Sequence, residues 1–394
     1  MSPGRDHDVV LFGATGFTGR LTAEHLARAM PAGGRWALAG RDRGRLAEVR
    51  DRLAAIDPRH ADLPLLPADV TDPDSLRALA GSAKVVITTV GPYLRHGEPL
   101  VAACAKAGTD YVDLTGEPEF VDRTYLRHHE TARDTGARLV HACGFDSIPY
   151  DLGTYFTVRQ LPEGVPLTVE AVLRGEGELS GGTYASALTA FSRPLGMLRA
   201  ARERRRVEPR PADRAVHTPL GPPRRDPSTG RWLVPMPTID PQVVARSAAA
   251  LDGYGPDFTY RQYLSVRRLP TVVAGGLGLA TLAVLAQIPP ARAALGRLRP
   301  PGAGPDERRR AESWFSLRFT GRGGGREVVT EFAGGDPGYA ETARMLGESA
   351  LCLAFDDLPE TAGQLTTAAA MGEALLDRLR RAGLTIRVVR TAGG

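Results

Sequence analysis

Lysine is almost absent from this chain. Lys84 and Lys106 are the only two, so nearly all of the 50 basic residues are arginines, set against 45 acidic residues for a net charge of +5. Such a bias indicates codon preference rather than a surface selected for nucleic acid. No basic stripe interleaved with aromatic residues is present, so we predict that nucleic acid is not a partner.

Cysteine is also scarce. Cys104, Cys143 and Cys352 are odd in number and have no paired spacing. This pattern argues against a disulfide framework and against a bound metal such as zinc. The amino-terminal residues carry no signal-peptide pattern before the first apolar run. We therefore expect a cytoplasmic protein without a metal site.

Long uncharged runs are rare, with one exception. Residues 269–291 contain no charged side chain and are flanked by Arg267, Arg268 and Arg292. The segment is long enough to span a bilayer, although arginines on both flanks do not indicate which end would face the cytoplasm. A membrane-surface or lipid-binding element, a buried helix and a contact between two subunits are the alternatives. The segment therefore allows peripheral membrane association or a homodimer.

A glycine-rich turn follows the first apolar run. Residues 8–12 predict a buried parallel strand, and a helical pattern begins directly after the turn. Gly13, Gly16 and Gly19 stand three residues apart, an extended-spacing relative of the dinucleotide-binding fingerprint. In that motif the first glycine permits the tight turn, the second lets the backbone approach a pyrophosphate, and the third allows close helix packing. We predict a cofactor-phosphate site whose loop also contains Thr15, Phe17 and Thr18.

The end of the second predicted strand indicates which cofactor binds. Arg41 follows residues 35–40, where NAD-preferring sites usually carry Asp or Glu for the ribose 2′-hydroxyl. Arginine instead suits a 2′-phosphate, because its planar fork pairs with phosphate oxygens. Asp69, after the third predicted strand, is placed beside the adenine or serves as a turn residue. A solvated surface arginine is the alternative, but we predict NADP(H).

Strands and helices alternate through the first half of the chain. The predicted strands are residues 63–66, 84–90, 111–114 and 138–141, and the predicted helices are 46–56, 98–107 and 122–135. This alternation predicts the α/β class, with a Rossmann doubly wound parallel sheet.

The second half departs from that alternation. We predict strands at residues 167–174, 232–239, 314–319 and 327–332, a helix at 183–202, two later helices at 340–354 and 366–381, and a last strand at 384–389. The central strands are expected to form an antiparallel sheet in an α+β second domain.

Ligands of such sheets lie beyond the carboxyl ends of the strands. Gly91 and Pro92 end the fourth strand and are placed beside the nicotinamide. Three side chains expected near these strand ends could exchange a proton while hydride is transferred, so Tyr93, Asp146 and Tyr150 are the catalytic candidates. The alternative for Asp146 is a helix cap. Tyr-x-x-x-Lys chemistry is excluded, since Ala stands four residues before each lysine.

Several motifs together resemble the saccharopine dehydrogenase-like oxidoreductases, and most closely the bacterial trans-acting enoyl reductases. They are Gly13-Ala14-Thr15-Gly16-Phe17-Thr18-Gly19, Ala39-Gly40-Arg41, Val90-Gly91-Pro92-Tyr93, residues 111–117, Gly144-Phe145-Asp146-Ser147-Ile148-Pro149-Tyr150-Asp151, residues 335–343 and residues 365–372. Saccharopine-forming enzymes carry Asp-Pro-Gly where this chain has Asp146-Ser147-Ile148-Pro149, which argues against an amino-acid substrate.

The resemblance implies an NADP-binding Rossmann domain with a second domain inserted before the chain returns to the first. We expect domains at residues 1–150, 151–335 and 336–394. The implied activity is NADPH-dependent reduction of an α,β-unsaturated acyl thioester, of polyketide or lipid type and bound to a carrier protein or free. An imine or amino-acid oxidoreductase, and a membrane-associated NADPH-binding protein without turnover, are the alternatives.

Overall fold

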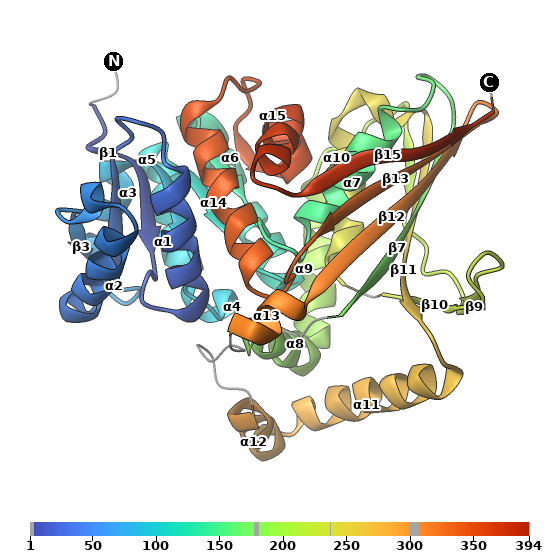
Figure 1. The fold of residues 1–394 in the computed structure, drawn as a ribbon, viewed down its shortest axis with the longest axis horizontal. Coiled ribbons are helices and arrows are strands. Elements are labelled where there is room, and N and C mark those ends of the chain that lie inside the picture. Colours follow the sequence, from blue (N-terminus) through green and yellow to red (C-terminus); the bar gives the residue numbers. More distant parts are fainter. Residues whose placement is uncertain (1–3, 177–180, 237, 299–306, 394) are drawn as a thin grey trace.

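The computed structural model describes residues 4–176, 181–236, 238–298 and 307–393, whose strands form two sheets (Figure 1). The first sheet contains β1 (His7–Phe12), β2 (Trp36–Gly40), β3 (Leu65–Pro67), β4 (Ala83–Thr88), β5 (Asp110–Asp113), β6 (Arg138–Val140) and β14 (Gly363–Leu365). Its order is β14-β6-β5-β4-β1-β2-β3, and all of its strand pairs are parallel. The predicted doubly wound Rossmann sheet is confirmed.

Helices connect these strands and cover both faces of the sheet. They are α1 (Phe17–Ala29), α2 (Arg43–Ile56), α3 (Pro73–Ser82), α4 (Tyr93–His96), α5 (Glu98–Ala107) and α6 (Pro118–Thr135), with a 3-10 turn at Pro58–His60. The apolar side chains of the central strands β1 and β4 are almost fully buried. Burial on both faces explains why these strands appear in the sequence as continuous apolar runs.

The second sheet is mixed rather than antiparallel, so that prediction was wrong. It contains β7 (Leu167–Glu176), β8 (Ala215–His217), β9 (Arg224–Arg225), β10 (Trp232–Pro235), β11 (Asp257–Val266), β12 (Trp314–Gly323), β13 (Arg326–Gly334) and β15 (Thr385–Ala392). Both β7 and β8 pair with β11 in parallel, whereas the other pairs are antiparallel. The strand β11 was not predicted, and its long connections to β7 make a parallel pairing possible.

The remaining helices are α7 (Ile148–Val158), α8 (Gly181–Ser192), α9 (Pro194–Val207), α10 (Asp240–Ala250), α11 (Leu269–Gln287), α12 (Pro289–Leu298), α13 (Glu307–Glu312), α14 (Ala340–Phe355) and α15 (Thr367–Arg381), with a 3-10 turn at Asp252–Tyr254. The single helix predicted over 183–202 is two helices, because Pro194 has no N–H to continue the first and opens the second. The strand predicted over 232–239 ends at Pro235, and α10 begins five residues later.

The carboxy-terminal segment serves both sheets. Helix α14 packs against β1, β4 and α1, and β14 extends the parallel sheet beside β6. Strand β15 instead pairs with β13 at the edge of the mixed sheet. The chain thus returns to the first sheet after contributing most of the second, and Figure 1 shows α14 and α15 between the two.

Helix α11 lies at the lower edge of Figure 1, where it packs against α8 and contacts the second sheet only at β10 and β11. The side chains of Leu277, Leu279 and Val284 are exposed, and Leu277 reaches 65%. The interpretation of residues 269–291 as a buried helix is therefore wrong. Within the described ranges, no helix combines the length and apolar character needed to cross a membrane.

Candidate active site

The glycine turn after β1 leaves the start of α1 open to a ligand. Gly13 has a φ of +91°, a left-handed backbone conformation that favours glycine. Helix α1 begins after Gly16, and no side chain caps its first N–H groups. Uncapped N–H groups at the positive end of a helix dipole bind phosphate. Phe17 and Thr18 are the first two residues of α1, and Thr15 precedes Gly16 in the loop.

The other two glycines differ in what surrounds them. A Cβ atom on Gly19 would lie 2.2 Å from the Gly13 carbonyl oxygen, so only glycine allows the helix this close to the turn. A Cβ on Gly16 would meet only that same oxygen, at 3.4 Å, and Gly16 is exposed. Gly19 therefore serves packing, while Gly16 borders the space where a pyrophosphate would lie.

Arg41 lies at the carboxyl end of β2 with its guanidinium largely in solvent. Its side chain is 76% exposed, and its Nε lies 4.0 Å from Asp69 Oδ2. Asp42, the nearest carboxylate in sequence, instead accepts a hydrogen bond from the Arg45 backbone N–H at 3.0 Å and caps α2. No acidic side chain is thus directed at a ribose 2′-hydroxyl from this strand end, and a guanidinium is available for a 2′-phosphate.

Asp69 is held by its own turn. Its Oδ1 accepts hydrogen bonds from the Thr71 backbone N–H and hydroxyl, each at 2.8 Å. These bonds are the main cause of a lowered pKa for the Asp69 carboxyl, and Arg41 adds to the effect. Arg41 and Asp69 therefore lie side by side beyond the ends of β2 and β3, where the sequence analysis expects the adenosine.

Gly91 and Pro92 lie in the loop between β4 and α4, and Pro92 directly precedes α4. Gly91 is exposed, and the atoms nearest to a Cβ there would be the Tyr93 ring at 3.7 Å and the Tyr93 backbone nitrogen at 4.0 Å. This glycine leaves room for a flat ring to approach the backbone, as expected beside a nicotinamide.

Tyr93 itself is buried, and its hydroxyl is engaged twice. The hydroxyl donates to the Thr88 carbonyl oxygen at 3.2 Å and accepts from the Leu114 backbone N–H at 3.2 Å. Burial raises its pKa well above the ordinary value for tyrosine. Among the three catalytic candidates, Tyr93 thus fits a role in joining the ends of β4 and β5 better than a role in proton transfer.

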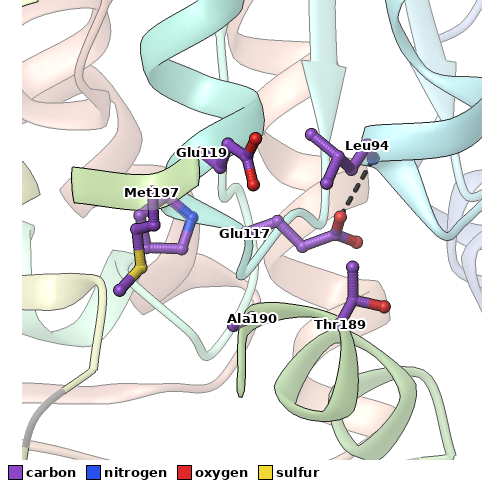
Figure 2. A pocket seen from close by; sticks show the side chains of 7 residues that line it. Leu94, Glu117, Glu119, Thr189, Ala190 and Met197 are labelled. Carbon is purple, nitrogen blue, oxygen red and sulfur yellow. Dashed lines mark hydrogen bonds between the residues drawn. The ribbon is translucent and has the colours of Figure 1, made fainter. Parts of the chain in front are cut away.

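Glu117, which is not among the catalytic or cofactor-binding residues predicted from the sequence, anchors the start of α4. Glu117 accepts hydrogen bonds from the backbone N–H groups of Tyr93 at 3.0 Å and Leu94 at 2.9 Å. Figure 2 shows this side chain at the wall of a small pocket. The lining residues are Leu94, Glu117, Pro118, Glu119, Thr189, Ala190 and Met197. The pocket is smaller than typical ligand sites. The sequence signal for Glu117 was its place at the end of the motif over residues 111–117.

Two other acids near the strand ends are fully hydrogen-bonded. Asp113 accepts from Tyr111, His141 and the backbone N–H groups of two residues, all within 3.0 Å. Asp151 accepts from the Ser247 hydroxyl, the Thr367 hydroxyl and the Ala368 N–H. Carboxylates satisfied in this way are fixed parts of the fold.

Asp146 differs from these acids. It lies in the loop between β6 and α7 and is half-buried, yet it makes no hydrogen bond or ion pair with any residue in the described ranges. Its Oδ2 lies 3.5 Å from the position that a Cβ on Gly116 would occupy, which places it at the end of β5. Burial raises its pKa to about 6, so the carboxyl holds and releases a proton near neutral pH.

Cys143 and Tyr150 lie on either side of Asp146 in the sequence. Tyr150, on the first turn of α7, is buried, and burial raises its pKa well above the ordinary value, with the charges of Asp240 and Asp146 adding to the effect. Cys143 is buried too, its pKa is raised in the same way, and its thiol donates to the Val140 carbonyl oxygen at 3.4 Å. Of the groups at this mouth, Asp146 has the pKa best suited to proton transfer.

Comparison with known proteins places the chain in a family. Residues 9–140 match the model of the saccharopine dehydrogenase NADP-binding domain. The trans-acting enoyl reductase of Mycobacterium ulcerans (strain Agy99) is 40% identical to this chain, and the alignment covers 98% of each protein. The trans-acting enoyl reductase of Mycobacterium leprae (strain TN) is 39% identical, and its alignment covers 99% of this chain and 100% of the relative. The chain belongs to the trans-acting enoyl reductase family.

Two further matches agree with that placement. Rv2449c of Mycobacterium tuberculosis (strain ATCC 25618 / H37Rv) is 42% identical over 98% of this chain and 99% of its own length. The apo saccharopine dehydrogenase (L-Glu forming) of Saccharomyces cerevisiae shares the fold, with a TM-score of 0.57 over 98% of this chain and 100% of that chain at 11% identity. This member of the enoyl reductase family is thus an NADP-dependent oxidoreductase, as the glycine turn and Arg41 predict.

Proposed function

We propose that the protein reduces the carbon–carbon double bond of an α,β-unsaturated acyl thioester with NADPH. The names and near-complete alignment of its relatives support this substrate class. The observation that carries the proposal is the unpartnered Asp146 carboxyl at the carboxyl edge of the parallel sheet. A proton donor at that edge is what a reduction needs beside a bound nicotinamide.

The cofactor would lie along the carboxyl edge of the sheet. NADPH, when bound there, supplies the hydride. The backbone between Gly13 and Gly19 would hold the pyrophosphate, and Arg41 would pair with the 2′-phosphate next to Asp69. Gly91 and Pro92 would border the nicotinamide and orient it.

Asp146 would supply the proton that completes the reduction. Its raised pKa keeps a part of the carboxyl protonated near neutral pH. Tyr150 is neutral at that pH, as tyrosine ordinarily is, and burial raises its pKa further, so it can orient the substrate thioester by donating a hydrogen bond. Saccharopine-like imine chemistry is the competing function, and the Asp-Ser-Ile-Pro sequence at 146–149 is the feature that disfavours it.

Stopped-flow measurement of NADPH consumption tests the proposal. The chain is mixed with NADPH and crotonyl-N-acetylcysteamine, with NADPH and a 2-keto acid plus ammonia, or with NADPH alone. Rapid oxidation only with the enoyl thioester is expected. Oxidation only with the keto acid and amine would favour the imine reaction, and tight NADPH binding without turnover would favour a nucleotide-binding protein without catalysis.

Two variants separate binding from chemistry in that assay. Gly16→Val places a side chain where the pyrophosphate would lie and is expected to abolish NADPH binding, measured by nucleotide fluorescence. Asp146→Asn is expected to bind NADPH with unchanged affinity and to lose about 10²- to 10⁴-fold in kcat. Equal loss of binding in both variants would contradict the roles given to these residues.

A reductase that acts in trans meets its substrate on another protein. We therefore propose a carrier-bound acyl thioester, of polyketide or lipid type, as the physiological substrate. Comparing the carrier-bound form with the free thioester of the same acyl chain tests this point, since a carrier contact would lower KM while leaving kcat unchanged.

We also propose that α11 and α12 rest on an anionic lipid surface. Residues 258–305 contain no Asp or Glu, and Arg267, Arg268 and Arg292 flank the uncharged helix. An exposed apolar helix with arginines at its ends has the charge and surface of an interfacial helix. A homodimer formed through the same face is the alternative outcome. Attached to a lipid surface in this way, a cytoplasmic protein would be a peripheral membrane protein.

A further inference from the structure

Arg310 reaches the start of α1 from the second sheet. It lies on α13, the short helix that directly precedes β12 (Figure 1). The central carbon of its guanidinium lies 5.5 Å from the centre of the Phe17 ring, within the range of a cation–π contact. Because Phe17 is the first residue of α1, this contact places a positive charge close to the helix start that no side chain caps.

The Phe17 ring is held in place by a second aromatic side chain. The centres of the Phe17 and Tyr339 rings are 4.7 Å apart, and their planes meet at 72°, an edge-to-face arrangement. Tyr339 is buried and directly precedes α14, which packs against β1 and α1. Phe17 therefore offers the Arg310 guanidinium a fixed apolar surface.

The Arg310 guanidinium has donors that the chain itself does not use. Its Nε atom is buried and has no hydrogen-bond partner among the residues that the structure describes. Arg308, on the same helix, differs: its side chain is 89% exposed, and its Nε lies 3.4 Å from Glu312 Oε1. A buried donor without a partner costs free energy until a ligand supplies an acceptor.

The end of α13 fixes where Arg310 can reach. The Ser313 backbone N–H donates to the Arg310 carbonyl oxygen at 3.2 Å, and the Ser313 hydroxyl donates to the Arg309 carbonyl oxygen at 2.9 Å. Strand β12 begins at the next residue and pairs with both β7 and β13. Arg310 is thus attached to an interior strand of the second sheet, although its guanidinium meets a helix of the first.

We propose that Arg310 binds the pyrophosphate of NADP(H) together with the backbone N–H groups at the start of α1. Pyrophosphate oxygens accept the paired donors of a guanidinium, and the charges are opposite. The pyrophosphate would supply the partner that Arg310 Nε lacks. The bound nucleotide would then be held by segments of both sheets. The inference concerns the cofactor alone, so it does not depend on which substrate is reduced.

This role differs from the one proposed for Arg41. Arg41 lies beyond the end of β2 and would contact the 2′-phosphate, which NADPH has and NADH lacks. Arg310 lies near the start of α1 and would contact the pyrophosphate, which NADPH, NADH and ADP-ribose share. Loss of either guanidinium should therefore change the nucleotide affinities in a different pattern.

Nucleotide affinities of the full chain test the assignment. Arg310→Ala is expected to raise Kd about tenfold for NADPH and NADH, measured by nucleotide fluorescence, and for ADP-ribose, measured by calorimetry. Kd for adenosine 2′-monophosphate, which has no pyrophosphate, should change by less than about twofold. The control is Arg308→Ala, whose guanidinium pairs within α13 and whose affinities should match wild type. Unchanged NADPH and ADP-ribose affinities in Arg310→Ala, or an equal loss in the control, would overturn the proposal.

A second measurement needs neither turnover nor a substituted chain. Phenylglyoxal modifies guanidinium groups, and peptide mass spectrometry follows Arg308 and Arg310 separately in wild type. ADP-ribose at about ten times its Kd is expected to slow modification of Arg310 about tenfold, because only the free protein reacts, and to leave Arg308 unchanged. An equal rate at Arg310 with and without ADP-ribose would overturn the proposal. Should wild type bind NADPH but oxidise none with the enoyl thioester, the proposed function fails, and these binding measurements still decide the role of Arg310.

Discussion

The Nε atom of Arg41 lies 4.0 Å from Oδ2 of Asp69, a separation that leaves the guanidinium only loosely paired. Asp69 takes its close hydrogen bonds from Thr71, and Asp42 takes its own from the start of α2. The arrangement leaves a cation beyond the end of β2 that no close carboxylate neutralises. In the cofactor site that we propose, selection of NADPH over NADH would depend mainly on this side chain.

We expect Arg41→Ala to raise KM for NADPH by about 10- to 100-fold, the cost of a lost charge-assisted pair with a phosphate. KM for NADH should stay within about threefold, because NADH has no 2′-phosphate. Initial rates with both nucleotides measure the change. Arg45→Ala is the matched control, since its backbone rather than its side chain is used at the start of α2. Equal effects on both nucleotides would contradict the assignment.

The glycine turn allows a second prediction, in which two similar substitutions have different effects. Gly19→Ala would place a Cβ 2.2 Å from the Gly13 carbonyl oxygen, so the turn must distort and the melting temperature should fall. Gly16→Ala has a nearest neighbour at 3.4 Å and should fold with nearly unchanged stability. Its NADPH affinity should nonetheless fall about tenfold, because the methyl group occupies the pyrophosphate side. Calorimetry and nucleotide titration of both variants measure the two effects.

The parallel half of the fold could be predicted because its signals are local. Buried strands produce apolar runs, the helix over 98–107 was located to the residue, and the Gly13 turn lies between a strand and a helix. The second sheet was harder because β11 pairs in parallel with a strand far away in the sequence. Strand direction depends on the path of long connections, which no local pattern encodes.

The candidate site divides in the same way. The residues proposed for the cofactor site follow strand ends, so strand prediction was enough to name them. The roles of buried polar groups depended instead on partners distant in sequence: Tyr93 bonds the ends of two strands, and Asp151 accepts a hydrogen bond from Ser247 of α10. Residue type alone could not separate the engaged Asp151 from the unpartnered Asp146, five positions earlier.

The hydrogen bonds of Asp151 predict a loss of stability on substitution. This carboxylate joins α7 to Ser247 of α10 and to the start of α15. In Asp151→Asn, an NH₂ group in the place of Oδ2 would face the two donors from Thr367 and Ala368 and could not accept their hydrogen bonds. The buried donors left unsatisfied should lower the free energy of unfolding by about 2–4 kcal/mol. The melting temperature should fall by about 5 °C or more. Asp377→Asn, which alters a half-exposed pair with Arg380, should change it by less than about 1 °C.

Helix α11 allows the last prediction, a test of the lipid-surface proposal in the full chain. Wild type should float with vesicles containing phosphatidylglycerol and remain unbound with phosphatidylcholine alone, because the flanking arginines favour anionic headgroups. Leu277→Glu should reduce the bound fraction about tenfold or more, since it removes an apolar contact and adds a negative charge. The control is Leu220→Glu, whose leucine is 67% exposed against 65% for Leu277 but lies outside α11. Flotation unaffected by Leu277→Glu would contradict the proposal, and a dimer in light scattering that only Leu277→Glu dissociates would assign this face to a second copy of the chain.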